Sequence, residues 1–127
     1  MNTEKVLFAF FIVLALTLNF GFFIGDVDQI DHHNIYELFA ALVVSLIATI
    51  LKLGDRTHMG AVLLATSLVA DLQLICAAVI WWYAENQSAV GFVPATVASI
   101  VSLSGGALLA NILSVILLIV ETVMVRR

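Results

Sequence analysis

Long apolar runs separated by short polar segments dominate the sequence. Four runs stand out, at about residues 6–24, 35–53, 60–83 and 93–125. Each is close to or above the roughly 20 residues with which an α-helix crosses the hydrocarbon core of a bilayer. Apolar and polar positions do not alternate with a period of two, which argues against the strands of a β-barrel. The pattern therefore predicts an all-α, integral membrane bundle of four transmembrane helices.

The segments between the runs are polar and rich in turn-forming residues: "GDVDQIDHHN", "GDRTHMG" and "AENQSAVGFVP". Composition strengthens the membrane interpretation, because 63% of the 127 residues are hydrophobic and 11% are charged. Ordinary soluble domains have about half apolar and about a quarter charged residues. The length predicts a single transmembrane domain over residues 1–127. The formal net charge is -4 and no basic patch is present, so nucleic acid is not an expected partner.

The positive charges predict how the helices are oriented. Lys5, Lys52, Arg56, Arg126 and Arg127 all fall on one side of a four-span arrangement. Because loops rich in Lys and Arg stay in the cytoplasm, both termini are expected to be cytoplasmic. Aromatic rings that favour the headgroup region gather at the opposite boundary and support the same orientation. These residues are Tyr36, Trp81, Trp82 and Tyr83.

A carboxylate interrupts the third apolar run near its centre. Asp71 lies about eleven residues from each end of that run, which places it near the bilayer midplane. An aspartate there costs about 2.5–3.5 kcal/mol even on permissive insertion scales, so Asp71 is expected to face the protein interior. Ser67, one turn earlier on the same face, is an expected hydrogen-bond partner. Asn111 lies at a similar depth and is the partner on another helix that we expect first.

The polar residues inside the apolar runs have two interpretations. In one, Asp71 and Gln73 hold a static bundle together through interhelical hydrogen bonds. In the other, Asp71 belongs to a proton-carrying or cation-coordinating site on a conduction path. The sequence leaves both open. The polar partners considered for Asp71 and Gln73 are Asn19, Ser45, Thr49 and Asn111.

Small residues recur at every fourth position along one face of the last run. Such a face lets helix backbones approach closely, which is a main route to helix packing in lipid. The partner could be the third helix of the same chain or the last helix of another copy. Since four helices enclose little more than side chains, we expect a homo-oligomer. The residues of this face are Ser102, Gly106, Ala110 and Ser114.

The segment between the first two runs is acidic and lies on the side without Lys or Arg. It is interpreted as a solvated loop, as a mouth that attracts cations, or as a divalent metal site in which His33 and Glu37 are four residues apart. Asn34, followed by Glu37, also fits a helix N-cap. Apart from such a metal, no cofactor is expected. The residues of this acidic outer segment are Asp26, Asp28, Asp31, His32, His33 and Glu37.

Sequence motifs for catalysis are absent. The chain has no G-x-S-x-G, H-E-x-x-H, phosphate-binding glycine loop or nucleotide fingerprint, so it is not expected to be an enzyme. Cys76 is the sole cysteine, which excludes an intramolecular disulfide and a C-x-x-C pair.

The run "YELFAALVVSLIATILKLGDRTHMGAVLLATSLVADLQL", about a third of the chain, resembles a family of short, uncharacterised bacterial inner-membrane proteins. The resemblance implies a four-helix fold in the bacterial inner membrane and no particular activity. The chain departs from the small multidrug transporters, because the core of its first apolar run holds no acid. It also lacks the phenylalanine-rich polar motifs of the fluoride channels.

These observations lead to one functional expectation and two alternatives. The first is an oligomeric channel or transport conduit for cations or protons, in contact with the lipid bilayer. The second is a structural or accessory subunit of a larger membrane complex. The third is a metal-binding membrane sensor that uses the acidic outer segment.

Overall fold

A computed structural model describes residues 3–24, 33–86 and 89–126. Helix α1 covers Thr3–Phe23, α2 covers Ile35–Lys52, α3 covers His58–Asn86 and α4 covers Pro94–Arg126. All four are long and apolar enough to cross a membrane, which confirms the all-α fold and the four long apolar helices expected from the sequence.

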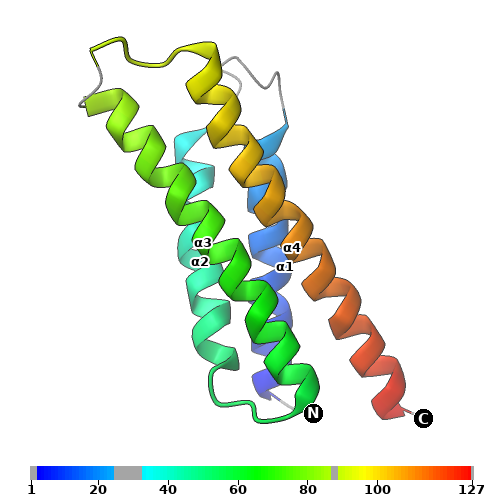
Figure 1. Ribbon diagram of the computed structural model, residues 1–127. Helices are drawn as coiled ribbons and strands as arrows, with labels where there is room; N and C mark the ends of the chain where they lie inside the picture. The colour runs from blue at the N-terminus through cyan, green and yellow to red at the C-terminus, as the bar shows by residue number, and fades with distance from the viewer. Residues whose placement is uncertain (1–2, 25–32, 87–88, 127) are drawn as a thin grey trace.

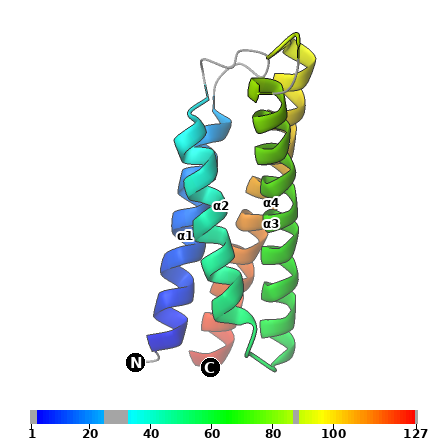
Figure 2. The same ribbon diagram turned by 90° about the vertical axis from the view of Figure 1, so that its left-hand side faces the viewer.

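The helices form an up-and-down bundle that closes on itself. Helix α1 packs on α2 and α4, and α3 packs on α2 and α4. Figure 1 shows α3 and α4 in front of α1 and α2, and Figure 2 shows these pairs as two layers side by side. Both ends of the chain lie at the same end of the bundle, which we call the terminal end. The opposite end carries the α1–α2 and α3–α4 connections.

Large apolar side chains cover the outside of the bundle. Leu72 on α3 is 64% exposed and Leu109 on α4 is 68% exposed, and similar residues are found on α1 and α2. Contiguous apolar surface on this scale is rare on soluble monomers, whereas lipid solvates it without penalty. The fold is therefore that of a multi-pass membrane protein with four candidate transmembrane helices.

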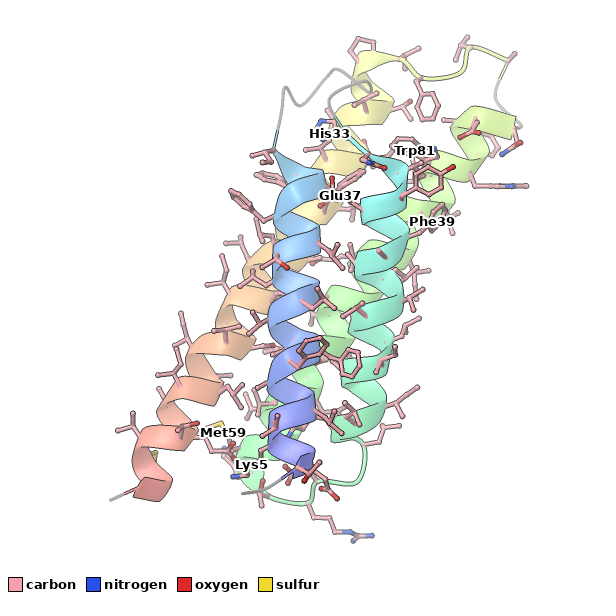
Figure 3. The ribbon with its side chains drawn as sticks, turned by 180° about the vertical axis from the view of Figure 1, so that it is seen from behind. Lys5, His33, Glu37, Phe39, Met59 and Trp81 are labelled. Atoms are coloured by element: carbon pink, nitrogen blue, oxygen red, sulfur yellow. The ribbon has the colours of Figure 1, made fainter. Side chains whose placement is uncertain are left out.

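Helix α4 continues without interruption through Gly105 and Gly106. The environment of Trp81 differs from the expectation. Trp81 was expected in the headgroup belt but is 7% exposed, with its ring 6.1 Å from Phe22 and 5.1 Å from Phe92. Trp81 lies near the end of the bundle opposite the termini, as expected, but its ring faces the interior (Figure 3).

The interior contains two apolar clusters along the bundle axis. One occupies the half opposite the terminal end, and the other occupies the terminal half. The first includes Phe22, Leu38, Leu74, Ala77, Trp81 and Ile100. The second includes Phe8, Ile12, Ala48 and Leu63.

The short α2–α3 connection is organised by Asp55. Its Oδ1 accepts hydrogen bonds from the Thr57 N–H at 2.9 Å and the Thr57 hydroxyl at 2.7 Å. Thr57 Oγ1 in turn accepts from the Gly60 N–H at 3.0 Å, which caps the start of α3. Lys52, 6% exposed, donates to Asp55 Oδ2 at 3.2 Å and lies 4.5 Å from the centre of the Phe8 ring.

Acidification should weaken this connection. The hydroxyl and N–H of Thr57, with a smaller contribution from Lys52, lower the pKa of Asp55 from 3.8 to about 2. A carboxylate with a depressed folded-state pKa stabilises the fold above its unfolded pKa, and that stability is lost as the pH falls through the folded-state value. We expect thermal stability in detergent to decline between pH 3.8 and about 2 and Asp55→Asn to flatten that part of the profile. Identical profiles for the two proteins would contradict this account.

Candidate functional site: a buried polar layer

Polar side chains form a layer in the middle of the bundle, between the two apolar clusters. Three helices contribute to it, and every member is 7% exposed or less. Since apolar packing is interrupted at this level, the layer must be stabilised by its own hydrogen bonds. We call it the central polar layer; its members are Ser45 and Thr49 on α2, Ser67 and Asp71 on α3, and Asn111 on α4.

Asp71 links α3 to α2 through both carboxyl oxygens. Ser45 Oγ donates to Oδ1 at 2.6 Å, and Thr49 Oγ1 lies 2.5 Å from Oδ2. Ser45 and Thr49 are one helical turn apart, so their hydroxyls project from the same face of α2 toward α3. Hydroxyls of the neighbouring helix thus replace the water that a carboxyl group would otherwise need.

The Thr49 hydroxyl has two possible acceptors but a single hydrogen atom. The Thr49 hydroxyl lies 2.9 Å from the Ser45 carbonyl as well as 2.5 Å from Asp71 Oδ2, and its one hydrogen serves only one of them well. A proton on Asp71 Oδ2 removes the conflict, because the carboxyl group then donates to Thr49 and Thr49 donates to the carbonyl. When Asp71 is ionised, the two acceptors share a single hydrogen.

The partners first expected for Asp71 do not bond to it, which corrects the expectation. Ser67 and Asn111 are both fully buried, yet Ser67 Oγ and both amide atoms of Asn111 have no hydrogen-bond partner among the described residues. Each unpaired buried polar group costs about 1–3 kcal/mol. The layer thus holds more polar groups than its own hydrogen bonds use.

Two contacts between α3 and α4 set the height of Asn111. Toward the terminal end, Thr66 and Ser114 are joined by a 2.6 Å hydrogen bond. Toward the other end, the Gln73 amide lies against Gly106, where a Cβ would overlap with it. In antiparallel helices, residue 111 is then level with the segment of α3 between Ser67 and Asp71. The unpaired groups and the carboxyl group consequently share one layer.

The remaining intramembrane candidates lie outside this layer. Asn19 is fully buried and its side chain bonds to Ser104 at 2.6 Å, which joins α1 to α4. Gln73 faces the side of α3 toward Gly106, and its buried Oε1 has no partner among the described residues. These groups extend polar contacts from the central polar layer toward the end opposite the termini.

The small-residue face of α4 is divided between two environments. Ala110 and Ser114 are buried, and Ser114 bonds to Thr66 of α3 in the same chain. Gly106 packs on Gln73, which is also on α3, whereas Ser102 is exposed. The third helix of the same chain is therefore the neighbour for most of this face.

The acidic outer segment falls largely outside the described residues, which applies to Asp26, Asp28, Asp31 and His32. Figure 3 shows His33 and Glu37 near the top of α1 and α2. His33 Nδ1 donates to the Phe22 carbonyl at 2.6 Å, and the Glu37 carboxylate lies against Gly21. Asn34 caps α2 as expected, accepting from the Tyr36 N–H at 2.8 Å. Within the described residues, no three His, Cys, Asp or Glu side chains gather as metal ligands.

Removing one hydroxyl from the layer should weaken the bundle. Thr49→Val keeps the side-chain shape but leaves Asp71 Oδ2 without its partner, so we expect the free energy of unfolding to fall by about 1–2 kcal/mol. The matched control is Thr17→Val, because the exposed Thr17 hydroxyl bonds only to the Leu14 carbonyl of its own helix. Its effect should stay within about 0.5 kcal/mol. Equal losses in chemical denaturation of the two variants would contradict a special role for Thr49.

Comparison with known proteins adds a family but no activity. No curated protein and no solved structure matches the chain. The sequence pattern of a family of unknown function (DUF6394) matches residues 32–122, a stretch that includes α2, α3 and the central polar layer. The chain belongs to this family of unknown function (DUF6394).

Proposed function

We propose that this protein transports protons or monovalent cations across the bacterial inner membrane, with Asp71 as the binding group and both termini in the cytoplasm. The observation that carries the proposal is the position of Asp71. It is near the middle of α3, 5% exposed, and hydrogen-bonded to two hydroxyls of α2. Ionisable residues placed this deep in a membrane usually serve a transported ion or proton.

Packing alone does not account for the chemistry of the layer. An interhelical hydrogen bond can be made by an amide or a hydroxyl, as Asn19 with Ser104 and Thr66 with Ser114 demonstrate elsewhere in the bundle. A carboxyl group adds a large desolvation penalty that a static contact does not need. The unpaired Ser67 and Asn111 add a further penalty. A site that binds and releases a charged species gives these groups a use.

The buried state of the layer favours transport by binding and release over an open pore. Ser45, Ser67 and Asn111 are 0% exposed, so no water-sized space touches them in this conformation. An ion or proton at Asp71 is closed off from both ends by the two apolar clusters. Transport therefore requires the helices to open toward one end at a time.

A structural or accessory role is the second candidate, and one observation favours it. The two contacts of Asp71 with Ser45 and Thr49 join α2 to α3, so the carboxyl group also serves packing. Under that role, the wild-type protein shows no transport activity, and Asp71→Asn changes only the stability of the assembly.

Association of several copies remains part of the proposal. The exposed Ser102 lines a shallow groove with Gly105 and Phe23, which is where a neighbouring copy could approach α4. Several copies would also bring their acidic outer segments together, and a ring of carboxylates raises the local cation concentration. The site itself is complete within one chain.

Reconstitution into liposomes tests the proposal. We expect the wild-type protein to carry protons or Na⁺ above the level of empty liposomes when a membrane potential is imposed, measured with an internal pH-sensitive dye and with radioactive sodium. Asp71→Asn should reduce the flux to the empty-liposome level, because an amide neither titrates nor offsets a cation. Absence of wild-type flux for both species would overturn the transport function.

Two further variants separate transport from folding. Glu121→Gln is the matched control, since Glu121 is the acid of α4 and pairs at 3.7 Å with Lys5 at the terminal end. It should keep its flux. Asp71→Glu should retain part of the activity if a carboxyl group is what matters. A flux that survives Asp71→Asn would remove Asp71 from the mechanism.

A further inference from the structure

We infer that the central polar layer binds one dehydrated Na⁺, which takes the place of the proton on Asp71. This inference rests on the proposed transport function and names its substrate. Three observations carry it: the donor atoms that the layer presents, the single negative charge, and the short distances between its oxygen atoms.

The donor atoms of the layer match a hard cation. Asp71 supplies two carboxylate oxygens, and Ser45 and Thr49 supply hydroxyl oxygens already in contact with them at 2.6 and 2.5 Å. Within this layer, the Ser67 hydroxyl and the Asn111 carbonyl oxygen are buried and have no partner among the described residues. Hard cations prefer oxygen ligands, and soft metals prefer sulfur or imidazole, which the layer lacks.

Ser67 and Asn111 turn a packing contact into a site. Ser67 is one turn from Asp71 on the same face of α3, and Asn111 is buried on α4 at the level of that segment. A cation between them would satisfy both oxygens, and the Asn111 amide nitrogen would be left to donate to the carboxylate. The two groups then gain the partners that they lack in the described structure.

Charge selects a monovalent ion. Asp71 provides one negative charge, which one Na⁺ neutralises, whereas a divalent ion would leave a net positive charge in a low-dielectric interior. Lys52 is the nearest cation along α2, and it pairs with Asp55 and the Phe8 ring instead. The other ionisable groups on the helices packed around Asp71 are Tyr36 and Glu37 on α2, His58, Cys76, Tyr83 and Glu85 on α3, and Glu121 on α4.

Size selects Na⁺ over K⁺. The oxygens that touch Asp71 lie 2.6 and 2.5 Å from its carboxyl oxygens, so a bound ion must push them outward. Dehydrated Na⁺ is smaller than dehydrated K⁺ and requires the smaller displacement. The protonated and Na⁺-bound states are then alternatives, because the ion needs the ionised carboxylate. Sodium binding releases one proton, and acid opposes it.

Thermal unfolding of the purified protein in detergent tests the inference, with the fluorescence of Trp81 and Trp82 as the signal. At mildly alkaline pH we expect NaCl to raise the melting temperature by several degrees over KCl or choline chloride at equal ionic strength. At mildly acidic pH the sodium effect should shrink, because the proton competes. Equal melting temperatures in the three salts at alkaline pH would overturn the inference.

Variants locate the ion. Asp71→Asn should abolish the sodium-specific shift, and Ser67→Ala should reduce it while removing only one hydroxyl. Ser99→Ala is the control, because the exposed Ser99 hydroxyl bonds to the Ala95 carbonyl of its own helix; its shift should match that of wild type. A sodium-specific shift that persists in Asp71→Asn would place the ion elsewhere. Equilibrium binding of radioactive sodium to wild-type protein checks the stoichiometry, for which we expect one ion per chain.

The inference and the transport function fail separately. Proton flux without a sodium-specific shift would overturn the sodium site and leave transport at Asp71 standing. A sodium-specific shift without any flux in liposomes would overturn the transport function and leave the sodium site standing.

Discussion

The contact between the Asp71 carboxyl group and two hydroxyls of α2 is the interaction on which the rest of the structure depends. A carboxyl group in the middle of a lipid-solvated helix must find polar partners inside the protein. Ser45 and Thr49 provide them, one for each oxygen. This requirement sets the rotation of α3 about its axis and the height at which α2 packs on it. The exposed apolar residues then follow on the outward faces.

The central polar layer divides what would otherwise be one apolar core. Above and below it, large side chains such as Phe22 and Phe8 fill the bundle. The two apolar clusters supply close packing and keep water from the layer, which raises the strength of every electrostatic contact inside it. A polar layer enclosed by two apolar clusters differs from a continuous water-filled pore. The same polar side chains that hold the helices together would therefore also bind a charged species.

The apolar runs were sufficient to predict the four helices, and the shared end of both termini follows from an even number of spans. The depth and inward orientation of Asp71 were also predictable, because the cost of a charge in lipid does not depend on which helix covers it. Its partners were predictable only in part: Asn111 and Ser67 were expected first, whereas the observed Ser45 and Thr49 were two members of the wider set considered. The depth of Asp71 along α3 does not determine which of the other helices packs against the face that carries it. The inward orientation of Trp81 could not be predicted for the same reason.

The short connection between α2 and α3 has a consequence for biogenesis. Asp71 and the hydroxyls that solvate it belong to consecutive helices joined by only a few residues. The two segments can therefore leave the insertion machinery as a paired hairpin, with the carboxyl group already covered before it meets lipid. If the carboxyl group and its hydroxyl partners were on helices far apart in the sequence, the carboxyl group would be exposed to lipid until the later helix was inserted.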